Sequence, residues 1–305
     1  MKELWTEKYR PNTIDGYVVT DQSQRELINH WIQTRSIPHL LLSGPAGTGK
    51  TTLAKLLINS MEIDPYDFLH VNASRDNGVD YLKQKVEGFV STMPFGHLKV
   101  VLLDEADYLS HNAQALLRGL METYAEQARF ILTCNLAHKI IGPLKSRCQS
   151  FVIDKTDPTE FTTRVATVLL NESVEFDIDT LDNYVKATYP DLRKCLNLCQ
   201  SNSITGTLTM NSSKDSGTGD YKLTVVELFK KKQIKEARTL LCKETAPDEM
   251  ESIFRWMYDN LELWGKSAEQ QDEAIKIIRK GLATVPLVSD QEINLSATII
   301  ELSQL

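Results

Sequence analysis

The sequence contains few cysteines, and their spacing does not indicate a structural metal site. Only five occur in 305 residues, and none forms the C-x-x-C pairs of a zinc site. Cys195 and Cys199 lie four apart on a predicted helix, without a second ligand pair nearby. We therefore interpret all five as buried thiols of a protein from a reducing compartment: Cys134, Cys148, Cys195, Cys199 and Cys242.

Long apolar runs are also missing. No run approaches the roughly 18 residues that a membrane-spanning helix needs. The first eight residues, MKELWTEK, lack the hydrophobic core of a signal peptide. We expect a cytoplasmic protein without a membrane partner.

The chain has no excess of positive charge. It carries 41 acidic and 34 basic residues, for a net charge of −7. Contact with nucleic acid would therefore depend on local patches rather than on the whole-chain balance. The hydrophobic and charged fractions, 42% and 25%, are ordinary for a globular protein. The length favours roughly two or three domains.

The most informative stretch, residues 40–52, reads LLLSGPAGTGKTT. A short apolar run meets the pattern G-x-x-x-x-G-K-T, and an apolar-patterned helix follows from about Thr51 to Asn59. This strand, loop and helix are the context that the phosphate-binding P-loop requires. Glycines let the backbone N–H groups turn toward phosphates, and the helix N-terminus adds partial positive charge. The sequence therefore predicts a nucleotide held by Gly47, Thr48, Gly49, Lys50, Thr51 and Thr52.

Continuous apolar segments alternate with amphipathic ones through the first half of the chain. This pattern predicts an α/β fold with a parallel sheet covered on both faces. Gly44, Asp104 and Asn135 follow three of the strands, and ligands bind beyond the carboxyl ends of such strands, so one pocket should collect them. We predict strands near 39–43, 68–72, 99–104, 129–134 and 150–153, and helices near 22–34, 51–59, 78–92 and 112–123.

After Asp157 the pattern is helical throughout. Three helices are expected at about 157–171, 177–188 and 190–200, and four or five more after a stretch rich in Ser, Thr and Gly. The predicted domains are a P-loop ATPase domain at 1–155, a helical lid at 156–205, a linker at 206–222 and an all-α collar at 223–305.

Carboxylates end the third predicted strand in the run DEAD. Asp104 is placed to bind Mg²⁺ together with the Thr51 hydroxyl. Glu105 is the candidate base that orients and activates the attacking water. The same four letters occur in RNA helicases, but those enzymes need a second nucleotide-binding core domain, and the segment after residue 155 is helical and too short to form one.

Several motifs occur in the order seen in clamp-loader ATPases. The chain resembles the small subunits of replication factor C, and most closely the large ATPase subunit of T-even-type phage clamp loaders. The resemblance covers residues 1 to about 200, whereas the collar matches only in helical character and length. Its motifs are Glu7-Lys8-Tyr9-Arg10-Pro11, Gly44–Thr52, Asn72-Ala73-Ser74, Asp104–Asp107, Cys134-Asn135, Ser146-Arg147-Cys148 and Asp191-Leu192-Arg193-Lys194.

The resemblance implies an AAA+ module, a three-helix lid and a collar that oligomerises. ATP and Mg²⁺ would be the cofactors. The partners would be further copies of the chain and a different loader subunit in a pentamer-like ring, the sliding clamp and primer–template DNA. A viral member of the family would act in the host cytoplasm.

The resemblance also implies residue roles. Thr6, Glu7, Lys8, Tyr9 and Val18 would border the adenine. Asn135 would position water and the γ-phosphate, and Arg193 would sense that phosphate from the lid. Arg147 would be an arginine finger that acts in trans on ATP bound by the neighbouring subunit. Surface ion pairs are the alternative for both arginines.

Contacts with DNA and with the clamp have weaker support. The family's DNA-tracking helix corresponds to the segment with Lys83 and Lys85, assisted by Arg75 and Lys99. Yet residues 75–99 carry a net charge of only +1, and Asn77 stands where cellular members usually have arginine. A solvated helix face would explain the lysines equally well. For the clamp contact, the resemblance suggests the segment Leu56–Ile63.

Two other functions remain open. One is another AAA+ machine, such as a branch-migration motor or a replication initiator, although those carry a DNA-binding domain at the C-terminus in place of a plain helical bundle. The other is a non-catalytic scaffold subunit, against which the intact Lys50, Thr51, Glu105, Asn135 and Arg147 argue.

Overall fold

The computed structural model describes residues 3–17, 22–210 and 221–305. The chain divides into two compact units, which we describe separately. One comprises Glu7–Asp157, and the other joins Met1–Thr6 to Pro158–Leu305. The residues of the predicted lid and collar therefore fall within the same unit.

A five-stranded parallel sheet forms the centre of the Glu7–Asp157 unit. All five predicted strands are present, with bounds within about one residue of those expected from the apolar runs. In the sheet they are ordered β2-β3-β4-β1-β5, so that β1 lies between β4 and β5. The strands are β1 (Leu40–Ser43), β2 (Phe68–Asn72), β3 (Lys99–Asp104), β4 (Ala128–Cys134) and β5 (Gln149–Val152).

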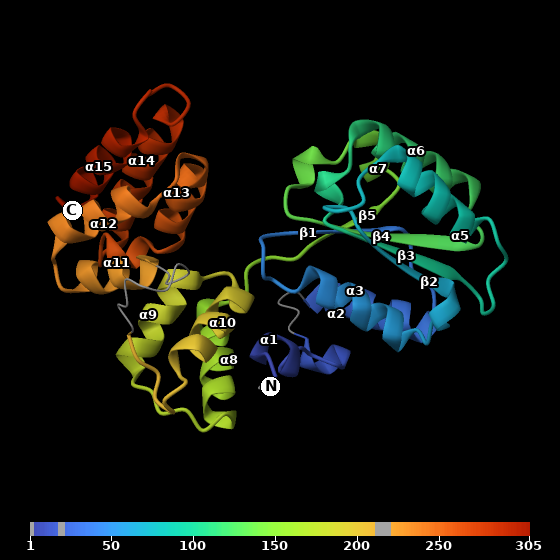
Figure 1. Cartoon of the computed structure of the whole chain (residues 1–305), viewed down its shortest axis with the longest axis horizontal. Helices are drawn as coiled ribbons and strands as arrows, with labels where there is room; N and C mark the ends of the chain where they lie inside the picture. The colour runs from blue at the N-terminus through green and yellow to red at the C-terminus, as the bar shows by residue number, and fades with distance from the viewer. Residues whose placement is uncertain (1–2, 18–21, 211–220) are drawn as a thin grey trace. The chain divides into compact units, whose positions relative to one another are not determined.

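Helices cover both faces of this sheet. Figure 1 shows α2 (Gln22–Thr34) and α3 (Lys50–Ser60) against one face, and α6 (His111–Thr123) and α7 (Gly142–Lys145) against the other. Successive strand side chains point to opposite faces, and every residue of β1 is buried. A continuous apolar run therefore supplies two cores at once, as the sequence predicted.

The segment after β2 forms one helical stretch with an irregular centre. It begins as α4 (Val79–Tyr81), continues as a π-helical segment (Leu82–Glu87) and ends as α5 (Gly88–Val90). Leu82, Val86 and Val90 are fully buried and share one side because they are spaced four residues apart. The predicted helix at 78–92 is thus present, with wider local winding that the sequence did not reveal.

Among its described residues, the second unit consists of helices, their connections and one isolated bridge between Glu175 and Thr207. Polar N-caps begin several helices: Asp177, Asp191 and Asp290 each accept a backbone N–H, and Ser267 forms a capping box with Gln270. In the described residues, no helix is long and apolar enough to span a membrane. The helices are α8 (Pro158–Asn171), α9 (Ile178–Thr188), α10 (Leu192–Asn202), α11 (Tyr221–Lys230), α12 (Ile234–Glu244), α13 (Met250–Asp259), α14 (Ala268–Thr284) and α15 (Gln291–Leu302).

Helices of the predicted lid contact helices of the predicted collar. Asp182 of α9 pairs with Lys230 of α11 at 2.7 Å, and the indole N–H of Trp256 donates to the Lys186 carbonyl oxygen at 2.9 Å. The first residues of the predicted linker pack against the predicted lid: Leu208 is buried, and its backbone N–H donates to the Glu175 carbonyl oxygen at 2.8 Å. Residues 211–220 of that linker lie outside the described residues.

The cysteines are mostly buried, in agreement with the sequence. Cys134, Cys195, Cys199 and Cys242 are buried, and Cys148 is half-buried. Burial raises the pKa of the Cys148 thiol to about 12 and helps raise that of Cys134 to about 11. Neither thiol is therefore a reactive thiolate near neutral pH.

Candidate nucleotide site

The loop between β1 and α3 has the backbone conformation that its glycines permit. Gly47 and Gly49 have φ angles of +74° and +92°, which residues with a side chain rarely adopt. At Gly44 a Cβ atom would lie 2.2 Å from the Ile153 carbonyl oxygen. The loop is therefore closely packed against the residue that follows β5 at one end and tightly curled at the other, and neither feature tolerates a larger residue.

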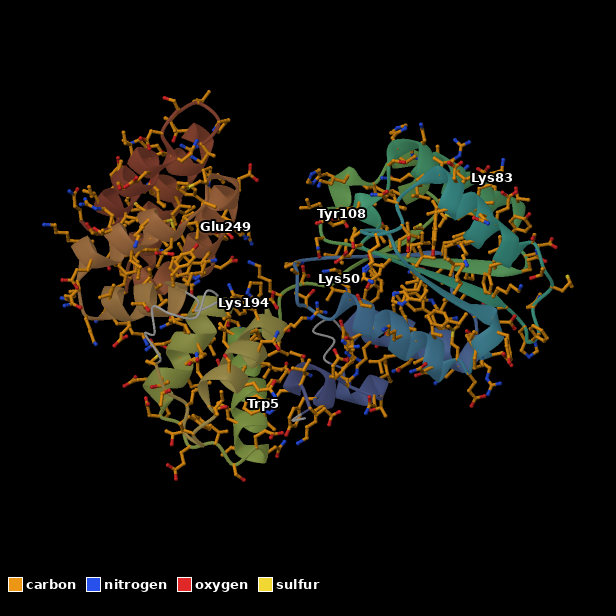
Figure 2. The ribbon with its side chains drawn as sticks, viewed as in Figure 1. Trp5, Lys50, Lys83, Tyr108, Lys194 and Glu249 are labelled. Atoms are coloured by element: carbon orange, nitrogen blue, oxygen red, sulfur yellow. The ribbon has the colours of Figure 1, made fainter. Side chains whose placement is uncertain are left out.

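Lys50 is the first residue of α3 and is largely buried beneath this loop. Its ammonium donates to the carbonyl oxygens of Gly44 at 2.9 Å and Pro45 at 2.6 Å. Figure 2 labels Lys50 where the loop leaves the sheet. A buried cation and the N-terminus of an eleven-residue helix thus meet within one curled loop, which is an arrangement suited to phosphate.

The carboxylate of Asp104 lies beside the start of the same helix. Its Oδ1 accepts hydrogen bonds from the hydroxyls of Thr51 at 2.7 Å and Thr133 at 2.5 Å. A hydroxyl and a carboxylate in contact are hard oxygen donors, the type that Mg²⁺ prefers, so this pair fits the metal predicted for it. The nearby His70 is held toward its neutral form because burial and the charge of Lys55 lower its pKa, against the effect of Asp104.

Glu105 adopts a backbone conformation that is unusual for its residue type. Its φ and ψ are +58° and +42°, in the left-handed region, which costs a non-glycine residue about 1–2 kcal/mol. Its N–H group donates to the hydroxyl of Thr133 at 3.0 Å. Strained backbone of this kind is concentrated at functional sites, so the geometry supports a functional hypothesis for Glu105.

Asn135 follows β4 and is exposed. The carboxylate of Asp107 accepts hydrogen bonds from the backbone N–H groups of Asn135 at 3.3 Å and Leu136 at 3.1 Å. Asp107 is buried, and its other oxygen has no partner among the described residues. Asp107 thus ties the segment after β3 to the segment after β4. Its place in the DEAD run was the only signal for this role in the sequence.

Arg147 lies near the amino ends of the strands, at the end of the sheet opposite the P-loop. It precedes β5, whose first residue, Gln149, pairs with Leu40 at the amino end of β1. The P-loop leaves the carboxyl end of β1, about 10 Å away along four residues of strand. The guanidinium forms an ion pair with Glu122 and donates to the Pro143 carbonyl oxygen at 2.7 Å. The structure therefore does not bring Arg147 to the P-loop of its own chain.

The residues predicted to contact adenine and to sense phosphate belong to both units. Arg193 is exposed in the first turn of α10 and lies in the helical unit with Thr6, whereas Glu7, Lys8 and Tyr9 lie with the sheet. Val18 lies outside the described residues. The N-terminal helix α1 (Trp5–Lys8) begins at a buried Trp5, whose backbone N–H donates to Gln200 Oε1 at 3.0 Å.

Of the four basic residues predicted near DNA, three are exposed: Arg75, Lys83 and Lys85. Figure 2 shows Lys83 directed outward from its helical segment. The prediction for Lys99 is wrong. Lys99 is almost fully buried, and its ammonium donates to the Phe89 carbonyl oxygen at 2.7 Å and to the Thr92 hydroxyl, so it closes the end of α5 and cannot meet a duplex.

The apolar side chains of the segment predicted to contact the clamp are largely turned inward. Leu56, Leu57, Ile58 and Met61 are all buried against the sheet, so they cannot meet a partner. Three other apolar or aromatic side chains in this unit are exposed instead. Tyr66, Met93 and Phe95 are each more than three-quarters exposed, and the rings of Tyr66 and Phe95 lie 5.6 Å apart.

Comparison with known proteins agrees with this architecture. Residues 40–155 match the ATPase family associated with various cellular activities (AAA). Among solved structures, a RuvB protein of Thermotoga maritima, described as a Holliday junction branch migration motor, aligns with 94% of this chain and 90% of its own at a TM-score of 0.55. Its sequence is only 14% identical, so the likeness shows the fold alone. The protein therefore has an AAA-type fold.

Curated relatives narrow the class to a family. The replication factor C small subunit of Sulfurisphaera tokodaii is 40% identical over 213 residues, 68% of this chain and 65% of that protein. The corresponding subunit of Methanococcus vannielii is 32% identical over 284 residues, 92% and 85% of the two chains. The chain belongs to the replication factor C small subunit family. It matches just under two thirds of the length of the first relatives, and the resemblance to the phage type remains a prediction.

Proposed function

We propose that this protein is the ATPase subunit of a sliding-clamp loader. In this function ATP binding assembles a spiral that opens the clamp and accepts primer–template DNA, and hydrolysis releases the clamp on DNA. The observation that carries the proposal is the contact between Thr51 and Asp104, which joins the phosphate-binding loop to the acidic end of β3. The family membership supplies the biological setting.

Each residue at the sheet edge has a task in this proposal. Lys50 and the N–H groups of residues 47–52 bind the phosphates, while Thr51 and Asp104 hold Mg²⁺, which neutralises charge on the β- and γ-phosphate oxygens when bound. Glu105 orients the attacking water and accepts its proton. Asn135 positions that water, on backbone that Asp107 anchors. Thr6, Glu7, Lys8, Tyr9 and Val18 border the adenine, and Arg193 reports the γ-phosphate to the lid.

Subunits communicate through Arg147 in this proposal. Its position at the amino edge of the sheet supports action on a neighbour's nucleotide, since its own P-loop lies at the carboxyl edge. The ion pair with Glu122 would hold the guanidinium until a neighbour docks. ATP then favours one subunit arrangement over another, so that the ring geometry and hydrolysis are coupled as a population shift.

Replacing Arg147 with alanine should leave ATP binding at the subunit's own site unchanged. In mixed rings, hydrolysis should fall about 10³-fold at the adjacent site, the lower end of the contribution of arginine fingers. The measurement is single-turnover hydrolysis in rings that contain one Arg147→Ala subunit, with Arg164→Ala as a control because Arg164 is a helix-surface arginine of α8. A defect confined to the variant's own nucleotide would contradict action in trans.

Two exposed surfaces are candidates for the remaining partners. Lys83 and Lys85 project from the helical segment after β2, and repeating them around a spiral would present several cations to one duplex backbone. The aromatic pair Tyr66 and Phe95, with Met93, forms an apolar surface suited to a protein partner, which we assign to the clamp. The carboxylate of Asp67, fully buried, accepts the N–H groups of Phe95 and Gly96 and holds this surface in shape.

The test of the proposed function is ATP turnover by the assembled ring. Clamp and primed DNA together should raise the rate at least tenfold over the ring alone, with a smaller effect of either component. A branch-migration motor would respond to junction DNA without a clamp, and a scaffold subunit would not turn over under any condition. An unstimulated rate, or stimulation by junction DNA only, would overturn the proposal.

A further inference from the structure

Thr133 is a buried polar residue at the end of a central strand. It is 1% exposed, and it pairs in register with Leu42 of the strand that leads into the P-loop. The two residues before it in β4, Ile131 and Leu132, are fully buried and apolar. A hydroxyl costs free energy in such surroundings unless its hydrogen-bonding groups are satisfied, so its partners reveal its role.

The hydroxyl of Thr133 has one partner on each side. It donates to Asp104 Oδ1 at 2.5 Å and accepts from the backbone N–H of Glu105 at 3.0 Å. The same Asp104 oxygen accepts the hydroxyl of Thr51 at 2.7 Å. A single side chain thus connects the carboxylate proposed to hold the metal with the backbone of the residue proposed as base.

This contact takes the place of backbone hydrogen bonding between β3 and β4 at the point where their pairing ends. The register between β3 and β4 runs from Lys99 opposite Ala128 to Leu103 opposite Leu132 and goes no further. Beyond it the chain turns into the left-handed conformation of Glu105, so the Glu105 N–H leaves the ladder. The hydroxyl of Thr133 receives this N–H. Without it, a partly buried donor would lose its partner and the strained turn would lose a restraint.

We propose that Thr133 is a positioning residue for hydrolysis, which fixes the Asp104 carboxylate and the Glu105 backbone in one geometry. This inference rests on the proposed ATPase function. Thr133 has no direct part in the chemistry; it acts through two residues that do. Catalysis depends on such positioning because small displacements of a reacting group strongly reduce the rate.

The test compares two substitutions at this position. Thr133→Val keeps the shape of the side chain but removes both hydrogen bonds, whereas Thr133→Ser keeps the hydroxyl. We expect the valine variant to lose about tenfold or more in kcat, with the KM for ATP within about threefold of the wild type, because the phosphate-binding loop is intact. The serine variant should recover kcat to within about threefold. Ile131→Val, a buried change on the same strand, is the packing control.

A second readout is independent of turnover. Mn²⁺ binding, followed by electron paramagnetic resonance with a non-hydrolysable ATP analogue, should weaken at least threefold in Thr133→Val and stay near the wild-type value in Thr133→Ser and Ile131→Val. If the valine variant does not fold, recovery of both properties in Thr133→Ser compared with Thr133→Ala decides the question.

The possible failures are distinguishable. If the wild type hydrolyses ATP and Thr133→Val does so at the same rate with unchanged Mn²⁺ affinity, the positioning role is overturned and the proposed function stays intact. Equal losses in the serine and Ile131→Val variants would show a packing effect and also overturn it. A wild-type ring that hydrolyses no ATP with clamp and primed DNA overturns the proposed function, and this inference with it.

Discussion

Replacing Lys50 with alanine is expected to reduce the affinity for ATP by at least 100-fold and to abolish hydrolysis. The Lys50 ammonium is largely buried under a loop whose N–H groups and helix terminus are all suited to anions. Removing it deletes a full positive charge at the centre of this arrangement, and charge-assisted contacts to phosphate are stronger than neutral ones. Titration with a fluorescent ATP analogue measures the loss directly.

The control addresses the structural role of the same side chain. Lys50 also donates to the carbonyl oxygens of Gly44 and Pro45, so the variant could bind poorly because its loop has rearranged. Lys50→Arg keeps the charge, and Lys55→Ala removes a neighbouring charge on the same helix. Equal melting temperatures without nucleotide would exclude general unfolding. Wild-type ATP affinity in Lys50→Ala would contradict the assignment of the P-loop.

Most of the sheet could be predicted because its strands are unambiguous in sequence. Leu40–Ser43 is a mostly apolar run that leads into the P-loop, and Lys99–Asp104 is one that ends in Asp104; strands buried on both faces are mostly apolar. The motif residues follow from the strands, since the carboxyl ends of parallel strands meet at one edge. Lys50, Thr51 and Asp104 could be placed together for that reason alone.

Residues that act through buried contacts could not be predicted in the same way. Thr133 resembles any β-branched strand residue until its partners are known, and the contact of Asp107 with the N–H group of Asn135 joins segments 28 residues apart. The prediction for Lys99 was wrong because a lysine is usually exposed, whereas here the carbonyl oxygen of Phe89 accepts a hydrogen bond from its ammonium. Sequence gives the residue type, but the burial of each polar group depends on the packed fold.

The exposure of some apolar residues could not be predicted from the sequence either. Met93 and Phe95 lie in the connection between α5 and β3, where a sequence pattern offers no reason to expect an apolar surface, and Tyr66 lies in the short 3₁₀ helix Pro65–Asp67. Leu56, Leu57 and Ile58, in the segment suggested for the clamp contact, are buried on the inner side of α3, so their side chains are not available to a partner. An apolar surface built from two separate chain segments has no periodic pattern in the sequence, so it can be recognised only when the fold brings the two segments together.

The second large effect is expected for Glu105→Gln. This variant should bind ATP and the clamp with wild-type affinity, and kcat should fall at least 100-fold, within the range for loss of a general base. Glutamine has almost the same shape as glutamate but cannot accept the proton of water. Single-turnover hydrolysis with clamp and primed DNA is the measurement. A rate close to that of the wild type would eliminate Glu105 as the base.

The strained backbone of Glu105 makes this prediction sharper. Glu105→Gly should relieve the strain of a left-handed residue, and its unfolding free energy should be no lower than that of Glu105→Gln, apart from side-chain effects. Both variants should nevertheless be inactive if hydrolysis requires the carboxylate.

Glu105→Asp tests whether a carboxylate at this turn is sufficient, because it keeps the carboxylate on a shorter side chain. Partial activity in Glu105→Asp alone would show that a base is needed at this turn, whereas equal activity in all three variants would show that the turn itself is the functional feature.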